Sequence, residues 1–140
     1  MASPYEIAFK YHTLGRCVIP SGGGDEGKKA LVPWEPFQKR RPTDAEVQAW
    51  EERLRPRVWA MVTGKVSGCF VVDCDSSEGV AIMAAAGLQP HVKTPRGGSH
   101  YYVALPSFPV PTKAGILPKV DVRGEGGYAN FSGGDVNGQV

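Results

Sequence analysis

Apolar positions spaced three or four residues apart predict two helices, and a serine suited to capping predicts a third. Two of them begin at capping boxes, Ser3-Pro4-Tyr5-Glu6 and Thr43-Asp44-Ala45-Glu46, in which side chains satisfy free backbone N–H groups. The third begins at Ser76 and runs to Ala86. Each helix is expected to end at a residue that interrupts helical geometry: Gly15, Pro56 and Gly87.

Short apolar runs with strand-like composition lie between and after these helices. They are residues 17–19, 58–62, 69–73, 92–94, 100–105, 119–123 and 128–131. The last four runs form two pairs, and a glycine turn joins the members of each pair. This predicts hairpins at residues 92–105 and 119–131, with a proline-rich loop between them. The pattern predicts a mixed α/β (α+β) fold in which helices flank a largely antiparallel sheet.

Length and composition are those of one globular domain with a real core, expected to span residues 1–140. A net charge of +2 does not by itself indicate nucleic-acid binding. Local basic clusters matter more, although a solvated surface explains each of them about as well. These clusters are Lys28-Lys29, Lys39-Arg40-Arg41 and Arg53/Arg55/Arg57.

The cysteine content and the hydropathy of the chain indicate its cellular compartment. The three cysteines form no CxxC pair, which argues against a zinc site or a disulfide framework. No secretory leader or membrane-length apolar run is found, so we expect a cytoplasmic protein without a membrane partner.

The strongest chemical signal is Asp73-Cys74-Asp75, at the end of the apolar run 69–72. Alternate residues of a strand face the same way, so both carboxylates share one face with Cα atoms about 6–7 Å apart. That geometry suits a divalent cation bound with nucleotide phosphates. The competing interpretation is that Asp75 caps the following turn and Asp73 is merely solvated.

Asp121 strengthens the metal interpretation, because it also lies in a strand-like run, Val120-Asp121-Val122-Arg123. Three carboxylates from two strands can bind two Mg²⁺ or Mn²⁺ ions. Arg123 lies two residues further along the strand, on the same face, where it would neutralise phosphate charge.

His100 follows a glycine turn that contains Arg96, and both side chains can donate to triphosphate oxygens. A lone strand histidine is more often structural. The glycine loop 22–28 lacks the ending of a Walker A loop, but Lys28 and Lys29 could reach phosphates or template. Trp34 lies in a loop-like context where base stacking is conceivable.

The order of these features resembles the small primase–polymerase (prim-pol) domains of phage and plasmid replication proteins, within the archaeo-eukaryotic primase superfamily. The stretches that carry the resemblance are residues 17–20, Gly27 to Trp34, Thr63-Gly64 with Gly68 to Asp75, Thr94 to His100, and Val120 to Tyr128. One departure is Asn130-Phe131-Ser132-Gly133-Gly134, where the family usually has a Pro-Pro-Ser-like segment. The chain is therefore expected to be a minimal version or a fragment of a longer primase–helicase protein.

The resemblance implies a primase-like catalytic core with one RRM-like half, in a bacterial or archaeal host cell. It assigns the metal ions to Asp73, Asp75 and Asp121, and the incoming nucleotide's phosphates to His100. Softer assignments to the nucleotide are Arg96, Ser99 and Arg123. The implied partners are a single-stranded DNA template, NTP or dNTP substrates, and a helicase that is fused or associated.

The favoured hypothesis is a DNA primase/polymerase, a nucleotidyltransferase that makes and extends primers by two-metal catalysis. A catalytically silent single-stranded DNA-binding module is the main alternative, since basic clusters and Trp34 would suffice for it. A metal-dependent nuclease is a third option, against which the Arg96/His100 pair argues.

Overall fold

The computed structural model describes residues 2–22, 29–93, 98–117, 119–133 and 137–138. Its helices are α1 (Pro4–Thr13), α2 (Asp44–Leu54) and α3 (Ser77–Ala85), with a 3₁₀ turn at Glu35–Gln38. Its strands are β1 (Val18–Ser21), β2 (Val58–Val62), β3 (Cys69–Cys74), β4 (Val92–Lys93), β5 (Ser99–Ala104), β6 (Lys113–Leu117), β7 (Val120–Arg123), β8 (Tyr128–Gly133) and β9 (Asn137–Gly138). Within these ranges, no helix has the length and apolar character needed to span a membrane.

The three helices begin where the sequence predicts. The Ser3 hydroxyl accepts a hydrogen bond from the backbone N–H of Glu6, and Ser76 does the same for Gly79. At α2, Thr43 and Glu46 form the reciprocal capping box in full. Such caps satisfy backbone donors that have no partner inside the helix, and they fix its first turn.

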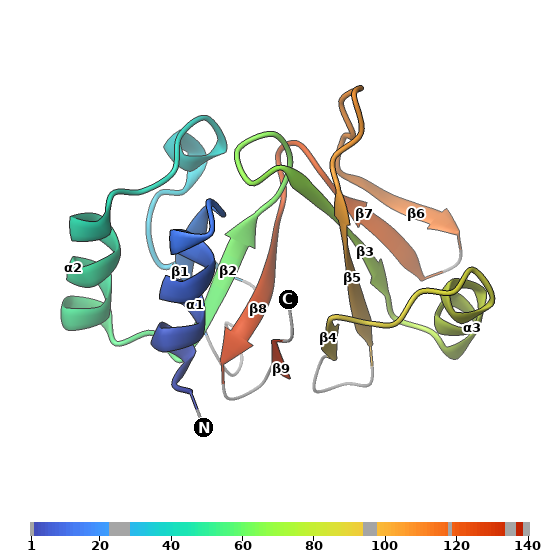
Figure 1. Cartoon of the computed structure of the whole chain (residues 1–140), viewed down its shortest axis with the longest axis horizontal. Helices are drawn as coiled ribbons and strands as arrows, with labels where there is room; N and C mark the ends of the chain where they lie inside the picture. The colour runs from blue at the N-terminus through green and yellow to red at the C-terminus, as the bar shows by residue number, and fades with distance from the viewer. Residues whose placement is uncertain (1, 23–28, 94–97, 118, 134–136, 139–140) are drawn as a thin grey trace.

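The strands form two antiparallel sheets, which confirms the predicted mixed α/β class. One sheet has the order β1-β2-β8 and the other β6-β7-β3-β5-β4-β9. Figure 1 shows the two sheets side by side, with α1 and α2 next to the three-stranded sheet and α3 at the outer side of the six-stranded one. The main apolar core lies between the first sheet and its helices, and a smaller cluster of Cys74, Tyr101 and Val120 packs beneath α3.

The predicted hairpin at residues 119–131 is wrong, because its two strands belong to different sheets. β7 pairs with β3 and β6, whereas β8 pairs with β2. The glycine turn after Arg123 carries the chain from one sheet to the other. The hairpin at residues 92–105 is confirmed by the β4–β5 pairing.

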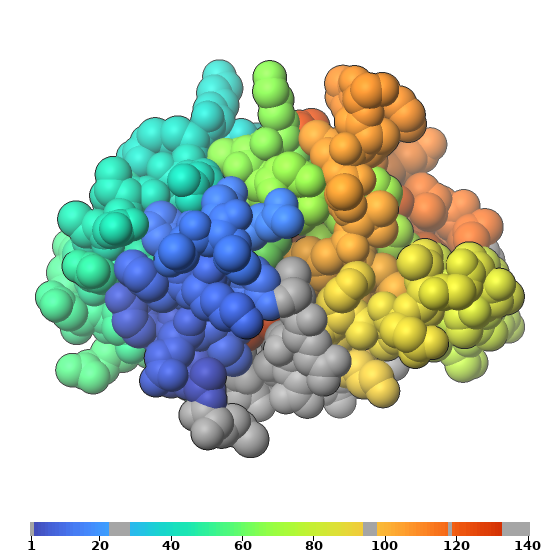
Figure 2. Space-filling view, viewed as in Figure 1, coloured from blue at the N-terminus to red at the C-terminus, as the bar shows by residue number. Residues whose placement is uncertain are grey.

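The proline-rich stretch after β5 is also more ordered than predicted, because it contains β6. All five residues of β6 are exposed. The strand therefore lacks the alternation of buried apolar and exposed polar residues by which a strand is predicted from sequence. In Figure 2 the orange segment between β5 and β6 projects from the top of the molecule. Its Val110 carbonyl accepts a hydrogen bond from the backbone N–H of Glu125, which ties it to the turn after β7.

All three cysteines are buried and free. Burial raises the pKa of the Cys17 thiol to about 12, although Arg41 and Arg40 act in the opposite direction. The Cys17 thiol donates to the Phe37 carbonyl oxygen, 3.2 Å away. Cys17 is therefore a packing residue, not a reactive thiol.

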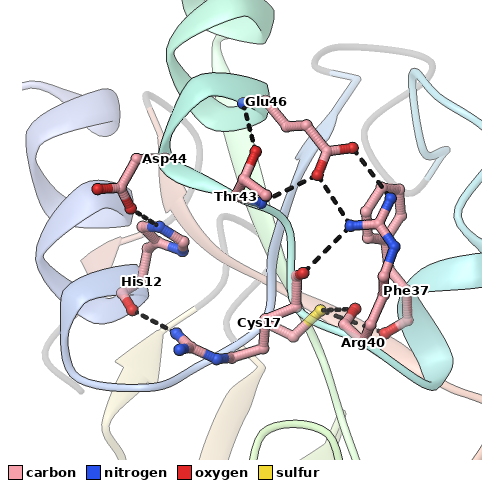
Figure 3. A network of polar contacts seen from close by, with 8 residues as sticks. His12, Cys17, Phe37, Arg40, Thr43, Asp44 and Glu46 are labelled. Atoms are coloured by element: carbon pink, nitrogen blue, oxygen red, sulfur yellow. Dashed lines mark hydrogen bonds and ion pairs between the residues drawn. The ribbon is translucent and has the colours of Figure 1, made fainter.

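A polar network joins α1, α2 and the segment before α2 (Figure 3). His12 Nε2 lies 2.7 Å from Asp44 Oδ1, and the Arg41 guanidinium donates to the His12 carbonyl oxygen. Arg40 donates to both carboxylate oxygens of Glu46, at 2.8 and 3.1 Å. Two residues of the basic cluster 39–41 therefore stabilise the fold.

Glu46 makes the stability of this region depend on pH. The hydrogen bond from Arg40, followed by that from the Thr43 backbone, lowers its pKa from 4.5 to about 2. Because the folded-state pKa is the lower one, the contribution to stability is complete above pH 4.5 and is lost as the pH falls through about 2. We expect Glu46→Gln to lower the free energy of unfolding at neutral pH by about 0.5–1 kcal/mol, since the pair is partly exposed.

Urea unfolding measured across this pH range tests the prediction. The difference between wild type and Glu46→Gln should shrink steadily as the pH drops below about 4.5. Glu52→Gln, at an exposed position of the same helix, serves as the control. A difference that does not depend on pH would contradict the assignment.

Candidate metal and phosphate site

The three predicted carboxylates meet on the six-stranded sheet. Asp73 and Asp121 are directly paired in the β3–β7 register, and paired residues of neighbouring strands lie on one face. Asp75 follows β3 two residues beyond Asp73, so strand alternation returns it to that face. One carboxylate oxygen from each residue lies within 4.8 Å of the other two.

This face of the sheet is turned toward the three-stranded sheet. Cys69 is on the same face of β3 as Asp73, four residues earlier, and its Sγ lies 3.7 Å from the sulfur of Met61 in β2. The opposite face carries Cys74 and packs beneath α3. The carboxylates therefore lie on the face of the sheet that carries Cys69, at the end of β3.

Asp73 is the buried member of the group, with 5% of its surface exposed. Its Oδ1 lies 3.3 Å from His100 Nε2, and its Oδ2 lies 3.4 Å from Arg123 Nη2. Burial acts to raise the pKa of Asp73, but His100 and Arg123 together outweigh it, so the pKa lies below its ordinary value. The buried carboxylate therefore remains ionised at neutral pH.

His100 lies opposite Asp73 in the β3–β5 register and is 6% exposed. Its Nδ1 and the Asp73 Oδ1 are both buried, and neither has a hydrogen bond within the described part of the chain. The contact between His100 and Asp73 is short enough for an ion pair but is not aligned as a hydrogen bond. Because unsatisfied buried polar atoms are costly, these two atoms are suited to binding a ligand.

The donor set fits a hard divalent cation. Mg²⁺ and Mn²⁺ prefer oxygen ligands, and the three carboxylates offer oxygens of graded exposure: Asp73 is buried, Asp121 intermediate and Asp75 exposed. The orphaned Oδ1 of Asp73 points to the same conclusion, since a bound cation would satisfy it. The residues present therefore fit the metal ions that the sequence predicts.

The other candidates for nucleotide binding, Arg123, Ser99 and Arg96, differ in where they lie relative to the carboxylates. Arg123 lies beside the carboxylates, because its guanidinium contacts Asp73. Ser99 is paired with Cys74, which places it on the α3 side of the sheet and away from the carboxylates. Arg96 lies outside the described residues.

Of the predicted template contacts, the structure describes Lys29 and Trp34. Lys28 lies outside the described residues, and Lys29 is exposed, with its carbonyl oxygen accepting from the backbone N–H of Gly22. Trp34 is half-buried and stacks edge-on against Tyr128, with ring centroids 4.8 Å apart. Trp34 is therefore committed at least partly to packing.

Tyr102 is a polar residue of the site face that sequence reasoning missed. It lies two residues after His100 in β5, and therefore on the same face. Its hydroxyl is buried without a hydrogen bond among the described residues, and burial raises its pKa well above the ordinary value. Counting alternate residues from His100 would have found it.

A group of carboxylates that could hold a divalent metal, beside an arginine and a histidine, is typical of enzymes that transfer phosphoryl or nucleotidyl groups. A comparison with protein families agrees: the model of the family "bifunctional DNA primase/polymerase, N-terminal" matches residues 8–138. The chain belongs to this family, whose members are metal-dependent DNA primases and polymerases acting on a DNA template and nucleotides. A search of curated proteins gave no match.

Proposed function

We propose that this chain catalyses template-directed nucleotidyl transfer, making and extending primers by a two-metal mechanism. The observation that carries the proposal is the meeting of Asp73, Asp75 and Asp121 within 4.8 Å. Membership of the primase/polymerase family supports it. Asp73 and Asp121 lie on adjacent strands of the sheet, and Asp75 follows directly after β3, so the site is built on a rigid element.

The three carboxylates would hold the metal ions. When bound, two such ions lower the pKa of an attacking 3′-hydroxyl and stabilise the departing pyrophosphate. Asp73 contributes an ionised carboxylate that the fold keeps charged by means of His100 and Arg123. Asp75 and Asp121 supply ligand oxygens that remain more accessible.

His100 and Arg123 would bind the triphosphate. Both are donors that form strong hydrogen bonds to anionic oxygens. Their position beside Asp73 places these donors at the edge of the carboxylate group, where the nucleotide's phosphates must lie if they share the metal ions. In that position they would offset negative charge that develops during transfer.

The biological setting belongs to the proposal as well. We infer a single-stranded DNA template held by exposed basic side chains, with salt-dependent affinity. The reaction would serve phage or plasmid replication in the cytoplasm of a bacterial or archaeal host, together with a fused or associated helicase.

Metal dependence of nucleotide incorporation tests the proposal. On a primed single-stranded template with labelled nucleotides, EDTA should abolish incorporation and added Mg²⁺ or Mn²⁺ should restore it, with a steep dependence on metal concentration. Incorporation that persists in EDTA would contradict the proposal. Template affinity without incorporation would favour a DNA-binding module, and loss of labelled DNA without nucleotides would favour a nuclease.

A further inference from the structure

The hairpin formed by β6 and β7 makes backbone hydrogen bonds to two of the three aspartates, and one of these bonds reaches a carboxylate. The Asp75 backbone N–H donates to the Lys119 carbonyl oxygen, 2.9 Å away. The Gly115 backbone N–H donates to Asp121 Oδ1, 2.8 Å away. The second bond is the more informative one, because it reaches the carboxylate itself.

The bond from Gly115 depends on an irregularity in β6. The pairing shifts between Lys113, opposite Val122, and Leu117, opposite Val120, so β6 has two more residues than β7 over this stretch. Gly115 lies within the bulge with a φ of +66°, in the left-handed region. A bulge of this kind redirects backbone groups out of the normal ladder, as other bulges do near active sites.

Packing does not explain the glycine at this position. A Cβ added to Gly115 would meet nothing within 4 Å, and the residue is exposed. Residues other than glycine adopt a positive φ only at an energetic cost. The backbone conformation therefore favours glycine, and the hydrogen bond to Asp121 is formed in that conformation.

We propose that Gly115 is a positioning residue for the metal site: its N–H holds one oxygen of Asp121 and leaves the other free to bind metal with Asp73 and Asp75. This inference rests on the proposed function. A carboxylate held in advance loses less rotational freedom when a metal binds, which favours affinity. Loss of a group that hydrogen-bonds a metal ligand typically changes metal affinity by about tenfold or more.

The test compares two glycines that both have a positive φ and open space around a would-be Cβ. Gly15, after α1, also has a positive φ, +96°, and open space around a would-be Cβ. Gly115→Val and Gly15→Val should therefore cost similar stability, because a β-branched residue is disfavoured at positive φ. Mn²⁺ affinity of the whole chain, measured by electron paramagnetic resonance of free Mn²⁺, should fall about tenfold in Gly115→Val alone.

A conservative replacement provides the rescue. Asparagine tolerates the left-handed region better than other non-glycine residues, so Gly115→Asn should bind Mn²⁺ nearly as tightly as wild type. Should either valine variant fail to fold, the Gly115→Ala and Gly15→Ala pair is measured in the same way, with a smaller expected loss at residue 115. Equal Mn²⁺ affinity in the two members of the folded pair would overturn the inference.

Asp121→Asn separates this inference from the proposed function. If Asp121→Asn weakens Mn²⁺ binding and the Gly115 variants do not, the positioning role fails and the metal site stands. If Asp121→Asn binds Mn²⁺ as tightly as wild type, the proposed metal site itself is wrong.

Discussion

Asp73→Asn should reduce the rate of nucleotide incorporation by about a thousandfold or more. Asp73 is the buried carboxylate of the group, and His100 and Arg123 keep it charged. Asparagine has nearly the same shape but no charge, so the metal ions would lose their best-positioned anionic ligand. Single-turnover primer extension at saturating template measures the loss directly.

A matched control distinguishes this effect from a general loss of charge near the site. Glu78→Gln removes an exposed carboxylate in the first turn of α3, close in sequence to Asp75. It should incorporate nucleotide at the wild-type rate. If Asp73→Asn kept more than about a tenth of wild-type activity while remaining folded, Asp73 would not be a metal ligand of the reaction.

His100→Ala is expected to lower kcat/KM for the incoming nucleotide by about a hundredfold, mainly through KM. The His100 Nδ1 is buried and has no hydrogen bond within the described chain, so it is available to a phosphate oxygen. His100→Gln, which retains an N–H donor, should recover part of the loss. Steady-state kinetics with varied nucleotide concentration measure the split between KM and kcat.

The control for this prediction is a second buried histidine, whose Nδ1 is likewise without a hydrogen bond among the described residues. His12 binds Asp44 and joins α1 to α2. His12→Gln should lower thermal stability and leave the KM for nucleotide unchanged. An unchanged KM in folded His100→Ala would show that His100 does not bind the substrate.

The features that sequence could predict are those set by local chemistry. Helix starts follow from Ser3, Thr43 and Ser76, whose oxygens satisfy backbone donors within a few residues. The shared face of Asp73 and Asp75 follows from strand alternation alone. The position of Asp121 beside them needed one further assumption, that its strand belongs to the same sheet, and the β3–β7 pairing agrees with it.

The features that sequence missed depend on long-range pairing. A glycine-rich turn such as residues 124–127 is compatible both with a hairpin and with a crossing between two sheets, and only the partners of β7 and β8 decide between them. The bulge at Gly115 lies in an exposed edge strand that has no apolar pattern to reveal it.

A crystal soaked with Mn²⁺ and a nucleoside triphosphate tests the central claim most directly. Anomalous scattering should place Mn²⁺ among the carboxylates of Asp73, Asp75 and Asp121, with phosphate oxygens within hydrogen-bonding distance of His100. Manganese found elsewhere, or triphosphate bound away from His100, would contradict this account of the site.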